Sequence, residues 1–148
     1  MYYAYIQQLS WSPAQYTVAA LLAFDVVGGV TTNATSSAKR WYHREGQGFA
    51  QHFGFIAMHA AQIFLVAWLF RGLDMVYFGS VYFYLLISAL SMLTVPLRIQ
   101  RSVALLFVCG AIVLSVYALS PTPGFEWFIP FLFIKLLVSH LTKEEPYV

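Results

Sequence analysis

The groups that could do chemistry in this 148-residue chain are a few ionisable side chains inside apolar stretches. If the first stretch crosses a membrane as a helix, Asp25 lies about six residues before its end, roughly 9 Å below the membrane–water interface at 1.5 Å per residue. A short carboxylate does not reach the interface from that depth. Because intramembrane charges mark functional positions by default, Asp25 is a candidate for binding or proton transfer, with a buried ion pair as the alternative. Gly29, one turn later on the same face, leaves room for a close neighbour.

Two histidines lie on one face of the second apolar stretch. His52 and His59 are seven residues apart, and Gln62 continues this polar face. Spacing seven places the rings about 10 Å apart, so the pair does not chelate one ion from a single helix. Each histidine can still be a metal ligand together with other helices, and His59 can be an axial haem ligand. The structural alternative is an ordinary hydrogen bond between helices.

The last apolar stretch carries Lys135 and His140. Lysine is the natural charge partner for Asp25, since each group offsets the desolvation cost of the other. The alternative is that its long stem carries the ammonium group to the interface. In an α-helix His140 is rotated about 140° from Lys135, so one helix does not direct both side chains to one point.

The composition predicts the class of protein that positions these groups. The chain is 60% hydrophobic and only 9% charged, whereas soluble domains are roughly 25% charged. A net charge of +2 is too small for a nucleic-acid surface. Cys109 is the single cysteine, which excludes an intrachain disulfide. An all-α, multi-pass integral membrane protein, with residues 1–148 forming one helical domain, fits these observations.

Hydropathy and helix signals predict five transmembrane helices. The first begins through Ser12, Pro13 and Gln15, which together form a capping box with proline in the first turn. A very short connection makes the second and third helices an antiparallel hairpin, and Pro96 ends the third. The fifth is at the minimum length for a span. The expected helices cover residues 13–30, 49–70, 75–95, 103–119 and 125–141.

The distribution of basic residues predicts the orientation. On the five-helix arrangement Arg71 alone lies on one side and six basic residues lie on the other. Because lysine and arginine are retained in cytoplasmic loops, the amino terminus is expected outside and the carboxyl terminus inside, in a plasma or inner membrane. Residues 31–48 and 96–101 are then cytoplasmic. The six residues of the basic side are Lys39, Arg40, Arg44, Arg98, Arg101 and Lys143.

Most of the polar groups fall in the predicted cytoplasmic half, which favours a polar pocket that opens inward. The first hypothesis is that this pocket binds an anionic amphipathic ligand such as a lipid head group. Asp25, His43 and His52 are the candidates for catalysis, with histidine as the general acid or base. The candidate ligand-binding residues are Asn33, Lys39, Arg40, Arg44, Lys135 and His140.

Two alternatives remain open, and enzyme status is undecided. The first is a metal or haem site for redox chemistry, built from four histidines and a carboxylate: Asp25, His43, His52, His59 and His140. The second is an accessory subunit that joins a homo-oligomer or a larger membrane complex through small-residue pairs such as Ala19 and Ala23. A proton-coupled transporter with Asp25, His59 and Lys135 as a relay is a variant.

Overall fold

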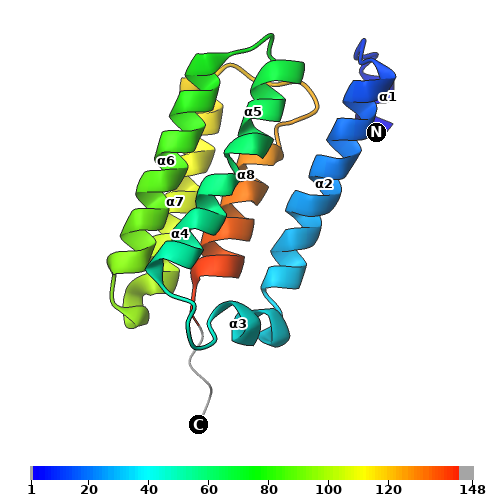
Figure 1. The fold of residues 1–148 in the computed structure, drawn as a ribbon. Helices are drawn as coiled ribbons and strands as arrows, with labels where there is room; N and C mark the ends of the chain where they lie inside the picture. The colour runs from blue at the N-terminus through cyan, green and yellow to red at the C-terminus, as the bar shows by residue number, and fades with distance from the viewer. Residues whose placement is uncertain (1, 144–148) are drawn as a thin grey trace.

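The computed structural model describes residues 2–143, and every regular element in this part of the chain is helical, as predicted. Figure 1 shows the long helices running side by side as a bundle, with α3 at one end and α1 at the other. The elements are α1 (Tyr2–Ile6), α2 (Pro13–Asn33), α3 (Ser36–Tyr42), α4 (Phe49–Met58), α5 (Ala60–Leu69), α6 (Met75–Thr94), α7 (Leu97–Val113), the π-helix η1 (Leu114–Ala118), α8 (Phe128–Phe133) and the π-helix η2 (Ile134–Leu141).

Four helical segments are long enough and apolar enough to cross a membrane. They are Pro13–Asn33, Phe49–Leu69, Met75–Thr94 and Leu97–Ala118, with 20 to 22 residues each. The last of these begins six residues before the expected start. Its first turn follows Pro96 directly, so the helix includes the polar residues that hydropathy assigned to a loop.

Local signals position these helices as expected. Ser12 Oγ accepts a hydrogen bond from the Gln15 backbone N–H (3.3 Å), and Gln15 Oε1 accepts one from the Ser12 N–H (2.7 Å). This is the predicted capping box, and Pro13 occupies the first turn. Asp74 caps α6 by accepting from the Tyr77 N–H at 2.9 Å.

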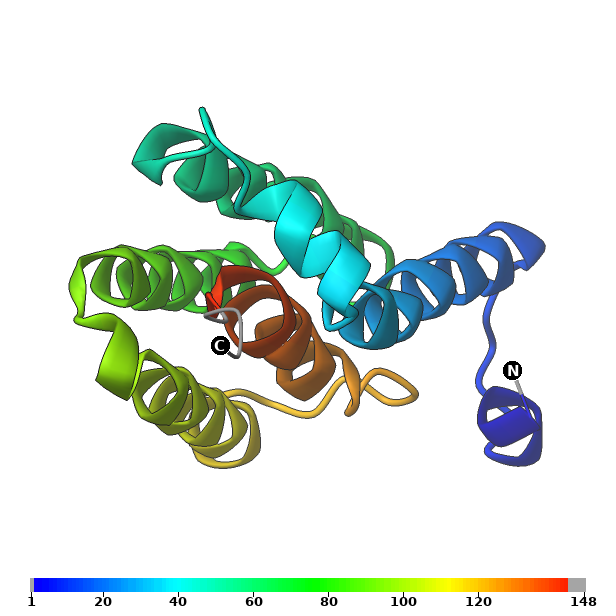
Figure 2. The ribbon, with the colours of Figure 1, turned by 90° about the horizontal axis from the view of Figure 1, so that it is seen from below.

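The fifth apolar helix, Phe128–Leu141, is shorter than the others and lies at the centre of the bundle. In Figure 2 it runs through the middle, in orange and red, and the longer helices surround it. It contacts α2, α6 and α7. Neighbouring helices cover most of its apolar side chains, whereas Phe131 is 37% exposed. Those that are fully or almost fully buried include Phe128, Leu132, Phe133, Leu136, Leu137 and Leu141.

Different elements lie at the two ends of the bundle. The central helix runs from the α1 end back to the α3 end, where the Lys143 backbone N–H donates to Gln100 Oε1 at 2.8 Å. The α3 end therefore holds α3, the turn at Pro96 and Thr142. The α1 end holds α1, the connection at 70–74 and the loop before α8.

Candidate functional site

An ion pair joins α2 to the central helix. Lys135 Nζ lies 2.6 Å from Asp25 Oδ2, and Gln62 Nε2 of α5 donates to the same oxygen. The lysine side chain is 5% exposed, whereas the aspartate side chain is 50% exposed. Lys135 thus pairs with Asp25 and does not extend to the interface. We call Asp25, His59, Gln62 and Lys135 the ion-pair cluster.

Glycine at residue 29 makes room for this pair. A methyl group at Gly29 would lie 2.5 Å from Lys135 Cε and 2.8 Å from Cδ. These distances are below van der Waals contact, so the lysine stem occupies the space that a side chain would need. The neighbour for which Gly29 leaves room is therefore the stem of Lys135.

His59 stands at a break between α4 and α5. Its backbone N–H donates to the Ile56 carbonyl at 3.0 Å, and its Nδ1 lies 2.8 Å from the Phe55 carbonyl. Because a carbonyl only accepts, Nδ1 carries the proton and donates. The ring thus satisfies a carbonyl that the interrupted helix leaves without its usual backbone donor.

Three histidines from three elements meet at the α3 end. His52 Nδ1 of α4 lies 3.2 Å from His140 Nε2 of the central helix, and His43 Nε2 donates to the His140 carbonyl at 3.1 Å. The rings of His43 and His52 lie 4.7 Å apart between centroids. His140 is 1% exposed, and its Nδ1 has no hydrogen-bond partner in the described residues. We call His43, His52 and His140 the histidine cluster.

Burial keeps His43, the histidine that follows α3, uncharged. Loss of hydration lowers the pKa of His43 to about 4, although its hydrogen bond to the His140 carbonyl acts in the opposite direction. The positive potential of Lys39 and Lys143 lowers this pKa further. His43 is therefore neutral at physiological pH.

Aromatic rings separate the two clusters. The Phe55 ring stacks on His140 with 4.3 Å between centroids and meets His59 edge-on at 5.0 Å. Tyr42 lies edge-on to His140 at 4.4 Å and donates a hydrogen bond to Asn33 Oδ1 at 3.3 Å. The structure thus divides the residues expected in one pocket between two sites. Sequence reasoning missed Phe55, although it lies three residues after His52 and four before His59.

The candidate ligand-binding residues Lys39, Arg40 and Arg44 differ in exposure. Lys39 is 5% exposed, and its ammonium group donates to the carbonyls of Thr142 (2.6 Å) and Val138 (3.2 Å) and to Thr142 Oγ1 (2.8 Å). It caps the central helix, where a cation also complements the helix dipole, so the chain itself holds this ammonium group. Arg40 is exposed and contacts Ser37 Oγ at 3.4 Å.

Arg44 lies at the mouth of a hollow beside the histidine cluster. Its guanidinium stacks 3.8 Å above the Trp41 ring, and its Nη1 donates to the Trp41 carbonyl. The hollow has a volume of about 430 Å³, and its lining includes His52, His140 and Gly54. No aspartate or glutamate is among the described lining residues. We call it the histidine hollow.

A second hollow, of about 320 Å³, lies on the other side of Tyr42 and Phe55, which line both. Its polar lining residues include Asp25, Asn33 and Lys135. Asn33 is 6% exposed, and its Nδ2 has no hydrogen-bond partner in the described part of the chain. We call this hollow the Asp25 groove.

The structure offers no ligand set for the metal hypothesis. Within residues 2–143 no group of three or more histidine, cysteine, aspartate or glutamate side chains is arranged to hold a metal ion. His52 and His59, the predicted metal pair, belong to different clusters with Phe55 between them. Their spacing of seven residues, about 10 Å along the helix, and the ring of Phe55 account for this separation.

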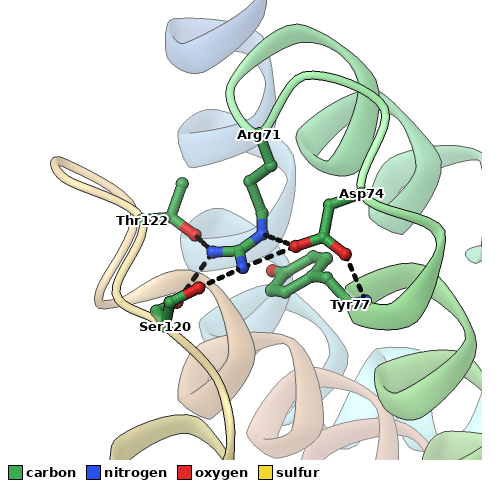
Figure 3. Close-up of polar contacts among 5 residues, drawn as sticks. All are labelled: Arg71, Asp74, Tyr77, Ser120 and Thr122. Atoms are coloured by element: carbon green, nitrogen blue, oxygen red, sulfur yellow. Dashed lines mark hydrogen bonds and ion pairs between the residues drawn. The ribbon is translucent and has the colours of Figure 1, made fainter.

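A third polar cluster, at the α1 end, is structural (Figure 3). The Arg71 guanidinium makes five hydrogen bonds, which match its five N–H donors. Two reach Asp74 Oδ2, and three reach Ser120 and Thr122 in the loop before α8. The backbone N–H of Tyr77 and then Arg71 lower the pKa of Asp74. This cluster joins two loops and leaves no donor of Arg71 for a ligand.

Comparison with known proteins adds no family to this description. A scan of protein-family models and searches of curated proteins and of solved structures each found no match to this chain.

Proposed function

We propose that this protein is a small multi-pass membrane protein that binds an anionic amphipathic ligand, such as a lipid head group, in the histidine hollow. The α3 end faces the cytoplasm in this proposal. Arg40, Arg44, Arg98 and Arg101 lie at that end, whereas Arg71 at the α1 end is fully engaged. The positive-inside rule then places the hollow at the inner leaflet.

This proposal rests on two groups that line one hollow. They are the guanidinium of Arg44 and the buried imidazole of His140, which can form a further hydrogen bond through Nδ1. Arg44 supplies a planar fork of donors that suits phosphate. His140 Nδ1 is buried, and none of the described residues offers it a hydrogen bond, which costs free energy. A bound ligand that satisfies this atom recovers that cost, and the absence of acidic lining residues favours an anion.

Acid–base chemistry on a bound ligand would rest on the histidine pair. The contact of 3.2 Å between His52 Nδ1 and His140 Nε2 requires that one ring donates and the other accepts. A proton can move along this contact, while His43 orients the backbone of His140 from the loop side. Asp25, the third predicted catalytic residue, lies in the other cluster and has no contact with this pair.

A blocking substitution tests the proposal. Gly54 lines the histidine hollow, and a side chain there meets no atom within 4 Å at Cβ, so Gly54→Leu should fill the hollow without disturbing the fold. Native mass spectrometry of the purified protein should show more bound phosphatidic acid than phosphatidylcholine of the same acyl chains. Gly54→Leu should reduce phosphatidic acid binding about tenfold.

Gly28→Leu is the matched control, because Gly28 also meets open space but lines the Asp25 groove. It should leave phosphatidic acid binding unchanged. Equal binding of the two lipids, or equal binding by Gly54→Leu and the unaltered protein, would show that the hollow is not an anion site.

A further inference from the structure

The Asp25 groove has hydrogen-bonding capacity that the chain does not use. Both contacts to the Asp25 carboxylate are made to Oδ2, and the described residues give Oδ1 no hydrogen bond. Lys135 has three ammonium donors, of which one contacts Asp25. Asn33 Nδ2 is buried, and no described residue forms a hydrogen bond with it. The groove thus offers one spare acceptor and spare donors at two positions.

The charges of the groove compensate each other. Asp25 and Lys135 are the only oppositely charged residues in its described lining, and they pair at 2.6 Å. A net charge of zero favours a neutral ligand, in contrast to the histidine hollow with its guanidinium. The groove and the hollow therefore select different ligands.

The position of the groove points to a ligand from the bilayer. Asp25 lies about 12 Å along α2 from Asn33, at 1.5 Å per residue, so the polar groups extend well below the helix end. The Asp25 side chain is 50% exposed and Phe24 is 83% exposed, which places the opening on the outer face of the bundle. A ligand enters this groove sideways from the lipid.

We propose that the Asp25 groove binds a neutral lipid with a free hydroxyl group, of the diacylglycerol class. The hydroxyl donates to Asp25 Oδ1, and its oxygen accepts from the neighbouring Lys135. An ester carbonyl farther along the ligand accepts from Asn33. The acyl chains then lie along Phe24 and Phe55, which line the groove. A partner helix is too wide, at about 10 Å, to reach the buried amide of Asn33, whereas an ester group on a narrow chain is small enough to reach it.

Two nearby glycines give a sharp test of this site. Gly28 lines the groove, and a Cβ there has nothing within 4 Å, so Gly28→Leu fills the groove without a clash. The full chain is placed in phosphatidylcholine vesicles with a photoactivatable diacylglycerol. We expect the label on α2, and Gly28→Leu should reduce labelling about tenfold. Asn33→Ala, which removes the unpaired donor, should also reduce it.

Two competing lipids and one control variant distinguish the possible outcomes. Dioleoylglycerol should compete with the label, whereas trioleoylglycerol, which lacks the hydroxyl, should not. Gly54→Leu should leave this labelling unchanged, so failure of the anion site and failure of this site are distinguishable. Equal competition by both acylglycerols, or full labelling of Gly28→Leu, would overturn the proposal. So would a loss of self-association in Gly28→Leu with unchanged labelling, because the face would then be a helix contact.

Discussion

Lys135 and Gly29 fit together so closely that the lysine stem fills the space a side chain at residue 29 would take. A methyl group at Gly29 would lie 2.5 Å from Lys135 Cε. A methyl group at the adjacent Gly28 would have no atom within 4 Å. These neighbours on α2 therefore have opposite tolerance for a side chain, although hydropathy does not distinguish them.

The first prediction concerns these two glycines. Gly29→Ala should lower the free energy of unfolding by about 1–3 kcal/mol, the usual cost of overpacking, because Lys135 is held at its far end by Asp25. Gly28→Ala should be neutral or slightly stabilising, since alanine is the better helix former. Thermal unfolding in detergent measures both. Equal midpoints for the two variants would contradict this packing.

The second prediction concerns the pair of Asp25 and Lys135. Lys135→Leu leaves the half-exposed carboxylate of Asp25 without its cation and should lower the free energy of unfolding by about 1–3 kcal/mol. The double variant Asp25→Leu/Lys135→Leu should be more stable than Lys135→Leu alone. A double-mutant cycle measures this coupling. Additive effects of the two substitutions would show that the groups do not interact.

The third prediction concerns the cap of the central helix. Lys39→Met removes three hydrogen bonds to Val138 and Thr142 and should lower the free energy of unfolding by about 2 kcal/mol. Arg40→Met, at the adjacent exposed position, should change it by less than about 0.5 kcal/mol. Chemical denaturation compares them. If Arg40→Met costs as much as Lys39→Met, the cap contributes nothing beyond general charge.

The fourth prediction concerns pH. Burial holds the pKa of His43 at about 4 in the folded protein, against 6.5 for an unperturbed histidine. Between these values the unfolded chain binds more protons, so stability should fall as the pH drops through this window and level off below it. Unfolding midpoints between pH 4 and 8 measure the slope. His43→Gln should make the slope shallower, and an unchanged slope would show that His43 does not contribute.

The fifth prediction concerns orientation. In a Cys109→Ser background, Glu45→Cys reports the α3 end and Pro123→Cys the α1 end, and both positions are exposed. A membrane-impermeant maleimide should label residue 123 in intact cells and residue 45 only after permeabilisation. The opposite pattern would reverse the proposed orientation and place the histidine hollow outside.

The sequence predicted the helical class, four of the long helices and a fifth apolar segment, because hydropathy and capping signals are local. Pairing of Asp25 with Lys135 was also predictable, since two isolated charges in apolar helices have few other partners. The central place of the shortest helix was not predictable. Its short length indicated a marginal span, whereas the packing of all five segments decides which one is covered.

The division into two clusters also needed tertiary structure. Periodicity placed His52 and His59 on one face, but the break at His59 turns its ring to the Phe55 carbonyl. Counting basic residues placed Lys39 in a cytoplasmic loop, and only the position of Thr142 shows that it caps a helix. The predicted homo-oligomer or larger complex remains a prediction.

The most direct test of the anion site observes its histidines during ligand binding. The protein is labelled with nitrogen-15 histidine in lipid nanodiscs and titrated with phosphatidic acid. We expect saturable shifts of the His52 and His140 ring resonances, unchanged resonances of His59, and loss of the shifts in Gly54→Leu. Ring resonances that do not move, or that move equally with phosphatidylcholine, would show that the histidine hollow does not bind an anionic head group.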